Sequence, residues 1–300
     1  EKMGKMNNLK KKRLMRRNMV GYSFIAPNFI GFAVFTMMPM LFSFGLSFCE
    51  WDSSHPIQFV GLQNFIGLLS DDTFWISLKN TIYFTVGTVP LTIVLSLGMS
   101  LLINQKIKGQ VLFRSIFFFP YVASLVAICV VWNLLFNPDM GPVNSLLAAL
   151  GVKELPRWTA SVKWALPTVI GLTVWKGAGY YMIVYLAALQ GISREIYEAA
   201  KVDGADAIRS FFSITLPLLT PTTFFVSTML IISSFKVFDT IYIMTGGGPG
   251  RATNVLVYYI YNTAFVKFKF GYASAISMVL FVLVLGITLV QFRGERKWAQ

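Results

Sequence analysis

The feature that most constrains this chain is a series of long stretches with almost no charge. An α-helix crosses the hydrocarbon core of a bilayer with about 20 mainly apolar residues. Five stretches of that length contain no Asp, Glu, Lys or Arg, and a sixth contains one charge, Lys176; together they cover residues 18–49, 80–105, 115–138, 164–193, 210–235 and 270–292. A soluble helix bundle would interrupt such stretches with polar faces. The pattern predicts an all-α, polytopic membrane protein with six transmembrane helices.

The charged and chemically reactive residues argue against several other classes of protein. The net charge of +13 is divided among loops and a basic N-terminal cluster, without a stripe on one face, so nucleic-acid binding is not expected. His55 is the only histidine, and Cys49 and Cys129 lie in apolar stretches, which argues against a metal site. No phosphate-binding motif G-x-x-x-x-G-K-S/T occurs. We therefore expect no catalytic residue, metal or cofactor in this chain.

The sequence is divided into a basic N-terminal segment, residues 1–19, and a single membrane domain, residues 20–295. The predicted spans cover about 20–49, 80–104, 112–136, 163–190, 213–238 and 270–292. Six spans bring both termini to the same side of the membrane. That side carries 17 of the 26 Lys and Arg residues, and the opposite side carries seven. Because basic loops are retained in the cytoplasm, both termini are predicted to be cytoplasmic.

A polar segment on the cytoplasmic side, residues 191–216, separates the fourth and fifth predicted spans. Ser193 suits the N-cap of a helix, and Glu198 suits the early turns of that helix. Gly204 permits a sharp change of direction, and Pro217 marks the entry to the fifth span. These residues predict a short helix, a turn and a second helix at the membrane surface, with small residues where another protein could approach closely. An ordinary amphipathic connector is the alternative interpretation.

The same segment carries a motif with fixed spacing. Glu198-Ala199-Ala200, three residues, Gly204, nine residues, Ile214, one residue and Leu216-Pro217 follow the pattern E-A-A-x3-G-x9-I-x-L-P. This pattern resembles the coupling motif of permease subunits in binding-protein-dependent ABC importers. From about residue 20 to 295 the chain is similar to the carbohydrate branch of that family, in particular to the larger maltose permease and the first glycerol-3-phosphate permease. Other segments support this resemblance: Gln63-Asn64-Phe65, Asn80-Thr81, Phe238-Asp239, Thr245-Gly246-Gly247-Gly248-Pro249 and Gly271-Tyr272-Ala273-Ser274-Ala275.

The resemblance implies a type I ABC importer permease fold in the bacterial cytoplasmic membrane, with a cytoplasmic coupling helix. Such a subunit is surrounded by membrane lipid, pairs with a second homologous permease subunit and receives a sugar from an extracytoplasmic solute-binding protein. Two ATP-binding subunits dock on the coupling loops, so ATP and Mg²⁺ are bound by those partners and not by this chain. The residues implied to contact the ATP-binding subunit are Glu198, Ala199, Ala200, Asp203 and Gly204.

The resemblance also implies that the sugar passes along the spans on either side of the coupling loop. The expected residues of this substrate path are Thr173, Lys176, Gly177 and Tyr180 in the fourth span and Leu230, Ser233, Ser234 and Val237 in the fifth. Thr173, Gly177 and Tyr180 share one helical face, where glycine leaves room and tyrosine offers a ring and a hydroxyl group. The same residue types also pack between membrane helices or anchor them at the interface.

Lys176 lies near the middle of the fourth predicted span, where a cation is costly unless it meets a partner or a water-filled cavity. Three interpretations stay open. The side chain forms an ion pair with the second permease subunit, contacts a negatively charged substrate, or turns toward the cytoplasmic side. The second interpretation favours acidic, uronate-containing oligosaccharides over neutral ones as the transported sugar.

Three other functions are weighed against an ABC importer subunit. A secondary active transporter would not need a loop that docks an ATP-binding subunit, and it often carries a carboxylate in mid-membrane, which is absent here. A polytopic enzyme would need a cluster of catalytic groups, and none is present. A non-transport membrane scaffold is the third alternative. Co-purification with a second permease and an ATP-binding subunit distinguishes the importer from all three.

Overall fold

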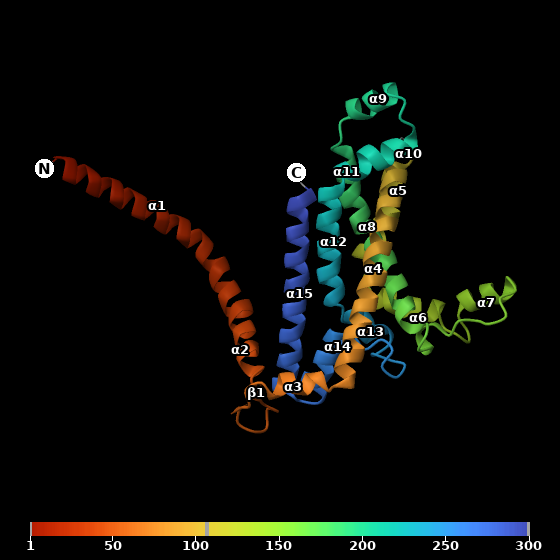
Figure 1. The fold of residues 1–300 in the computed structure, drawn as a ribbon, viewed down its shortest axis with the longest axis horizontal. Coiled ribbons are helices and arrows are strands. Elements are labelled where there is room, and N and C mark those ends of the chain that lie inside the picture. Colours follow the sequence, from red (N-terminus) through yellow and green to blue (C-terminus); the bar gives the residue numbers. More distant parts are fainter. Residues whose placement is uncertain (1, 106–107, 299–300) are drawn as a thin grey trace.

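The computed structural model describes residues 2–105 and 108–298, with the side chains of residues 15–105 and 108–294. The described chain is almost entirely helical (Figure 1). One departure from the predicted all-α class is a two-residue antiparallel pair, β1 (Cys49–Glu50) with β2 (Gln58–Phe59). Four helices are long and apolar enough to cross a membrane, and two bent helix pairs each qualify as one further span. The six predicted spans correspond to these six units.

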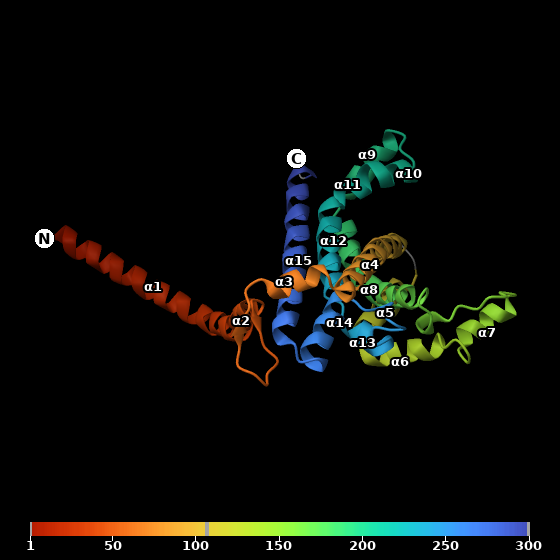
Figure 2. The same cartoon turned by 60° about the horizontal axis from the view of Figure 1, so that its bottom comes forward.

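The first unit is one long, curved helix. It consists of α1 (Lys2–Phe32), a π-helical turn η1 (Ala33–Met37) and α2 (Met38–Leu46), and its apolar, membrane-length part is Met15–Leu46. Figures 1 and 2 both show this helix diverging from the other helices, which it meets only near the end of α2. Only 6% of its apolar window is buried. The described part of the chain therefore leaves most of this apolar helix uncovered.

The centre of the molecule is a bundle of α4 (Asp72–Asn104), α8 (Ala165–Gln190), α12 (Thr220–Phe235) and α15 (Phe270–Trp298). A stripe of buried hydroxyl residues lies along α4, including Thr81, Thr85, Thr92 and Ser96. Their hydroxyl groups donate to backbone carbonyls four residues earlier, at 2.5–2.8 Å. Small side chains whose polar atoms are satisfied within their own helix let neighbouring helices approach closely. The stripe thus explains how a polar sequence pattern can lie in the core of this bundle.

The third predicted span, 112–136, is wrong as a single helix. The structure divides it into α5 (Gln110–Val122) and α6 (Leu125–Leu135), which are bent by 96° at Ala123 and Ser124. Pro120 lies in the last turn of α5 and has no N–H to donate to the preceding turn. Ala123 adopts an extended backbone conformation, and Ser124 is also non-helical, with φ of -54° and ψ of 124°. Hydropathy could not reveal this break, because the residues on both sides are equally apolar.

The fifth predicted span, 213–238, is also bent. It begins with α10 (Ala207–Ser210), the π-helical turn η3 (Phe211–Thr215) and α11 (Leu216–Leu218), and it continues as α12 after a bend of 64°. Pro217 and Pro221 lie on either side of the bend at Leu219. Each proline lacks a backbone donor, so this part of the helix loses stabilising hydrogen bonds. The C-terminal end of the span also differs, because α12 ends at Phe235 rather than at residue 238.

The short elements gather at two ends of the bundle (Figure 1). At one end lie α9 (Arg194–Val202), α10 and the C-terminal part of α15; we call this the coupling end. The opposite end carries the connecting segments, which contain α3 (Gln63–Leu69), α7 (Pro142–Ala149), the 3₁₀ turn η2 (Trp158–Ala160), α13 (Asp239–Met244), α14 (Leu256–Tyr261) and the π-helical turn η4 (Asn262–Val266). We call this the loop end.

Candidate coupling loop and translocation path

The predicted helix–turn–helix at the coupling end is present as α9, a turn and α10. Ser193 caps α9 by accepting a hydrogen bond from the Glu195 amide at 3.3 Å, and Asp206 caps α10 through the Arg209 amide at 2.7 Å. After α9 the Ala205 amide donates to the Ala200 carbonyl, and the Gly204 amide donates to the Lys201 carbonyl. This pair of bonds is a Schellman motif, which requires a left-handed residue at its centre.

Gly204 is the left-handed residue of that motif, with φ of +80°. The motif pairs the third residue from the helix end with the second residue after that end. Here these are Ala200 and Ala205, so the last alanine of E-A-A and the glycine must be four positions apart. The spacing of the sequence motif is therefore the spacing that this helix ending requires.

The residues of this loop project away from the bundle (Figure 1). Glu198, Ala199, Asp203 and Gly204 are exposed and Ala200 is half-buried. A methyl group added to Gly204 would meet nothing within 4 Å. One hydrogen bond at 2.9 Å, between Tyr197 Oη and Thr215 Oγ1, ties α9 to the start of the bent fifth span. This hydrogen bond connects α9 to the turn η3, which leads into α11 and α12.

The fourth span, α8, presents the predicted substrate face as a partly open surface. Thr173, Gly177 and Tyr180 are all half-buried, whereas their neighbours Leu172, Val174 and Ala178 are buried in the core. A methyl group at Gly177 would meet nothing within 4 Å, so the backbone is accessible there. The structure therefore brings these three residues together on one face, as the sequence predicts.

Tyr121 is a neighbour of this face that the sequence did not indicate. Its ring stacks on that of Tyr180, with centroids 4.7 Å apart and an angle of 20° between the planes. Tyr121 belongs to the last turn of α5, and it reaches α8 because α5 packs along that helix. A prediction that treats 112–136 as one straight helix has no reason to single out this tyrosine.

The Lys176 ammonium group is bonded to the backbone of α5 and of the break that follows it. Its Nζ donates to the carbonyl oxygens of Pro120, Tyr121 and Ala123 at 2.9, 2.9 and 3.0 Å. The ammonium group also lies 5.8 Å from the centre of the Tyr121 ring. An ammonium group has three N–H donors, and all three are used here. Within this chain Lys176 is therefore bonded to the C-terminal end of α5.

The fifth span does not present its four predicted residues on one open surface. Leu230 and Ser234 are only 5% and 4% exposed, and they pack inside the chain's own core. Ser233 is exposed and Val237 is half-buried, but Val237 lies beyond the end of α12. Because α12 ends at Phe235, the spacing of a continuous helix does not apply to Val237. Ser233 and Val237 are accessible in the described chain and Leu230 and Ser234 are buried within it, and a role of any of the four in the path stays a prediction.

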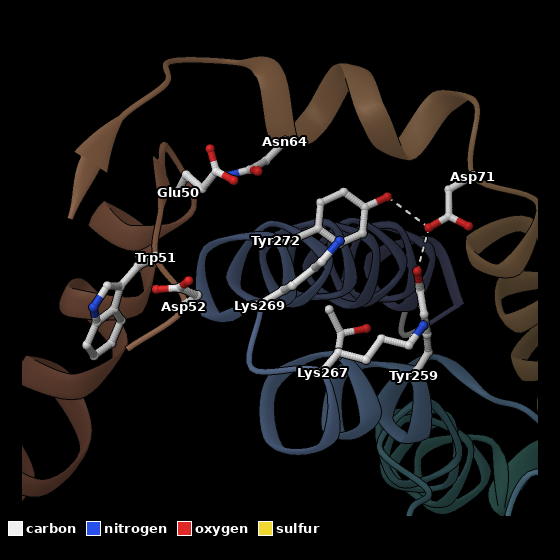
Figure 3. A pocket seen from close by; sticks show the side chains of 10 residues that line it. Glu50, Trp51, Asp52, Asn64, Asp71, Tyr259, Lys267, Lys269 and Tyr272 are labelled. Carbon is white, nitrogen blue, oxygen red and sulfur yellow. Dashed lines mark hydrogen bonds between the residues drawn. The ribbon is translucent and has the colours of Figure 1, made fainter. Parts of the chain in front are cut away.

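A polar cavity of about 500 Å³ at the loop end was not predicted (Figure 3). It lies between the segment that follows α2, the turn η4 and the start of α15, and it is lined by Glu50, Trp51, Asp52, Asn64, Asp71, Tyr259, Thr263, Lys267, Lys269 and Tyr272. The hydroxyl groups of Tyr259 and Tyr272 both point at the Asp71 carboxylate, and that of Tyr272 donates at 2.8 Å. One carboxylate thus joins α14 and α15 to the segment that precedes α4.

Asp71 also begins the second span, because its other carboxylate oxygen accepts from the Thr73 and Phe74 amides at 2.8 and 3.3 Å. Partial burial by itself would raise the pKa of this carboxyl group. Hydrogen bonds from Tyr259, Tyr272 and the two amides outweigh burial and hold the pKa below its usual value. The negative charge is therefore stabilised at the positive end of α4.

The loop end also contains the single histidine. His55 Nδ1 lies 2.7 Å from Asp52 Oδ2, and this hydrogen bond, together with backbone donors, lowers the pKa of Asp52 to about 2. Across the described residues no group of three His, Cys, Asp or Glu side chains is placed to hold a metal ion.

Comparison with known proteins decides which family has these features. Residues 89–297 match the family model described as "Binding-protein-dependent transport system inner membrane component". The chain belongs to this family of permease subunits. The match contains the coupling motif, α8 and the bent fifth span. The protein is accordingly an inner-membrane, multi-pass subunit of an ABC transporter and is not itself an enzyme, since ATP is bound by partner subunits in this family.

Relatives extend the likeness to nearly the whole chain. The trehalose/maltose transport system permease protein MalF of Thermococcus litoralis is 35% identical over 97% of this chain and 98% of its own length. Among solved structures, a bacterial alginate ABC transporter in complex with its periplasmic protein has a TM-score of 0.84 at 24% identity, covering 95% of this chain and 96% of its own. A second structure, of a bacterial ABC transporter involved in the import of the acidic polysaccharide alginate, has a TM-score of 0.82 at 26% identity, covering 96% of this chain and 99% of its own. The predicted fold and family are therefore confirmed.

Proposed function

We propose that this permease is one of two homologous subunits that form the translocation path of an ATP-driven oligosaccharide importer. The observation that carries the proposal is α9. It is an exposed helix that ends in a Schellman motif, carries the family's coupling sequence, and is tied to the bent fifth span by Tyr197. Two ATP-binding subunits supply ATP hydrolysis, and a solute-binding protein outside the membrane delivers the sugar. On this proposal the coupling end and both termini lie in the cytoplasm.

The proposed coupling between ATP hydrolysis and helix movement depends on α9 and the turn after it moving as one rigid unit. Glu198, Ala199, Ala200, Asp203 and Gly204 enter a groove of the ATP-binding subunit. Movement of that subunit on ATP binding then pushes α9 as a rigid body. The push reaches α12 through the contact between Tyr197 and Thr215 and moves the helices between inward-facing and outward-facing packings.

The path for the sugar runs along the open face of α8. Thr173, Gly177 and Tyr180 offer a hydroxyl group, an accessible backbone and an aromatic ring. Ser233 is the exposed member of the four residues predicted on the neighbouring span. A pyranose ring presents C–H groups on its faces and hydroxyl groups at its rim, and this combination suits an aromatic ring beside hydroxyl groups.

A second permease subunit completes this half-path. The first helix, Met15–Leu46, is apolar and almost uncovered by the described part of this chain. In a heteromeric transporter it would pack against the homologous partner, with lipid on its outer side.

Acidic oligosaccharides are the substrate class that we favour among oligosaccharides. Both alginate transporter structures match nearly the whole length of this chain, and one is described as involved in the import of the "acidic polysaccharide alginate". Lys176 lies beside Gly177 and Tyr180, but its three donors are bonded to carbonyls of this chain, so the preference for acidic sugars is supported by the two alginate transporter structures and not by Lys176. A neutral disaccharide is the alternative, because the archaeal relative is a trehalose/maltose permease.

Purification and reconstitution test the proposed function. The chain is expressed with the products of its neighbouring genes and purified in detergent through a tag on this subunit. A second permease and an ATP-binding subunit should co-purify, and sugar-loaded binding protein should stimulate ATP hydrolysis in proteoliposomes. Isolation of this chain alone as a stable, fully assembled protein would argue against the proposal.

The substrate class is tested separately, in the same proteoliposomes. Uronate-containing and neutral oligosaccharides of equal length compete for uptake in the presence of the cognate binding protein. Competition by the uronate series supports an acidic substrate. Stimulation of ATP hydrolysis by neutral sugars alone would rule it out.

A further inference from the structure

We propose that Lys176 is a positioning residue that closes the C-terminal end of α5 from the neighbouring helix and thereby holds the right-angle break between α5 and α6. The inference rests on the proposed function only for its consequence, the placement of Tyr121 beside the sugar path. It assigns Lys176 neither to the substrate nor to the second permease subunit.

The first step concerns the carbonyl groups at the end of α5. The last four carbonyls of any helix have no partner within that helix. In α5 the Phe119 carbonyl is satisfied by the Ala123 amide at 3.1 Å, which still leaves later ones open. Lys176 supplies donors to Pro120, Tyr121 and Ala123. Without it these carbonyls would have no protein donor within a membrane-spanning segment, where irregular backbone is tolerated only if protein groups or the water of a cavity satisfy it.

The second step concerns charge. The C-terminal end of a helix carries partial negative charge, and a cation placed there is stabilised. The mid-membrane cation predicted from the sequence and the broken helix seen in the structure are therefore complementary. Each is costly in a bilayer on its own, and each satisfies the other.

The third step concerns rigidity. Directly after Lys176, α8 meets α5 at two more places. A methyl group at Gly179 would collide with the Phe117 carbonyl, so the two backbones touch there, and the Tyr180 ring stacks on Tyr121. Backbone contact, ring stacking and the ammonium cap together fix the end of α5 to one turn of α8. The two segments should then move as one body when the path opens.

A substrate contact by Lys176 makes a different prediction. A ligand residue exchanges its hydrogen bonds between substrate and water, whereas the three donors here are already bound to the chain itself. If the ammonium group bound a uronate directly, its removal would affect acidic sugars selectively. If it holds the break, its removal should affect every transported sugar alike.

The angle of the break can be measured directly. Leu112 of α5 and Leu134 of α6 are both exposed and suit spin labels, in a background in which Cys49 and Cys129 have been replaced. At a rise of 1.5 Å per residue the two arms are roughly 15 Å long, so their ends lie about 20 Å apart at the observed break and about 30 Å apart in a straight helix. The assembled transporter in proteoliposomes is measured by pulsed electron paramagnetic resonance.

The variants are Lys176→Met, which keeps the length without a donor, and Lys176→Gln, which keeps a neutral donor. Lys163→Met near the start of α8 is the matched control, because Lys163 is exposed and outside the path. We expect Lys176→Met to broaden the label distance toward longer values and to slow uptake by about tenfold or more for every sugar carried. Lys176→Gln should recover part of both losses, and Lys163→Met should match the wild type.

A wild-type distance in Lys176→Met would overturn the inference, as would a loss of uptake confined to acidic sugars in both Lys176 variants. If Lys176→Met does not assemble, Lys176→Gln decides. The cap is supported if Lys176→Gln lengthens the distance between the labels, or if it keeps both the wild-type distance and the uptake of every sugar. The cap is overturned if Lys176→Gln keeps the wild-type distance but loses uptake of acidic sugars. Failure of the proposed function can be distinguished from failure of this inference. If the wild type shows no sugar-stimulated ATP hydrolysis, the distance between the labels can still be measured.

Discussion

Asp71 and Lys176 act on opposite kinds of helix end. Asp71 accepts hydrogen bonds from amides at the start of α4, and Lys176 donates to carbonyls at the end of α5. In each case the sign of the side-chain charge is opposite to that of the helix end it meets. Both residues also join separate elements, because Asp71 binds Tyr259 and Tyr272 while Lys176 belongs to α8. A residue that closes a helix end from another element stabilises tertiary structure as well as the helix.

Replacement of Asp71 tests this role at the loop end. Asp71→Ala removes the cap and leaves two tyrosine hydroxyl groups without their acceptor, which should cost about 2 kcal/mol of stability. Asp71→Asn keeps a good cap and one acceptor oxygen, so a smaller loss is expected. The measurement is the melting temperature of the purified complex. Equal melting temperatures for wild type and Asp71→Ala would contradict the role.

The same carboxylate predicts a pH dependence. Because the folded-state pKa of Asp71 is lowered, the charge contributes its full stabilisation above the unfolded pKa of about 3.9 and loses it as the pH falls through the folded value. The difference in melting temperature between wild type and Asp71→Asn should stay constant from neutral pH to about pH 5 and shrink below about pH 4. A difference that instead grows on acidification would show that the neutral form is the stabilising one.

Tyr180 is the residue whose loss should slow transport without disturbing sugar capture. Tyr180→Ala removes the ring that faces the path, and uptake should fall roughly two- to tenfold if stacking contributes about 0.5–1.5 kcal/mol. Tyr180→Phe keeps the ring and tests the hydroxyl group. The affinity of the isolated binding protein should not change. Tyr83→Ala on the exposed side of α4 is the control, and equal uptake in both alanine variants would show that Tyr180 only packs.

At the scale of elements, broken helices distinguish this fold from six plain spans. The break between α5 and α6 follows directly after Tyr121, which stacks on Tyr180 of α8, and the bend before α12 lies between the coupling helix and the bundle. Proline lies at or beside both interruptions, in α5 and around Leu219. Irregular backbone inside a membrane is tolerated where protein groups satisfy it, which Lys176 does for the first break.

The coupling helix offers the sharpest test at this scale. Gly204→Asp places a charged side chain at an exposed, left-handed turn, and Glu198→Lys reverses the charge on α9. Each should abolish sugar-stimulated ATP hydrolysis while membrane insertion is unaffected, because insertion depends on the apolar spans.

Gly151→Asp is the matched control for this prediction. Gly151 also has a positive φ, +85°, and open space around it, but it lies at the loop end. Backbone strain should therefore be similar, and only the docking partner differs. Full ATP hydrolysis in Gly204→Asp, or equal losses in Gly204→Asp and Gly151→Asp, would refute docking at this turn.

At the scale of the whole molecule, the described chain leaves a large apolar surface of its first helix uncovered. The first helix leaves the bundle, and Phe35 in its π-helical turn is 82% exposed. A homologous partner or lipid must cover this surface, and the proposed function assigns part of it to the partner.

Cross-linking distinguishes the two kinds of neighbour. A Phe35→Cys variant, in a background without the native cysteines, should cross-link to a cysteine in the second permease after treatment with a short bifunctional reagent. A shifted band that contains both subunits on a denaturing gel is the measurement. His55→Cys, on an exposed loop at the loop end, serves as the control. A Phe35→Cys variant that reacts only with lipid-soluble reagents would show that lipid covers the helix.

Six apolar stretches were enough to predict the membrane class and the approximate spans, because the free energy of insertion is a sum over local residues. The coupling turn was equally predictable, since a Schellman motif is made by residues within one helix ending. The open face of α8 was also predictable, because residues three and four positions apart share one face of a helix. Whether these residues contact sugar and ATP-binding subunit stays a prediction.

Tertiary structure decided the rest. The break after α5 is stabilised by Lys176, 53 residues later than Ala123, and the cavity at the loop end is closed by Tyr259 and Tyr272 around Asp71, 188 and 201 residues away. The burial of Leu230 and Ser234 likewise depends on which helices pack around α12. Hydropathy describes how each residue meets the bilayer. Hydropathy carries no information about hydrogen bonds between distant segments. Within a membrane those bonds help to determine where a helix ends.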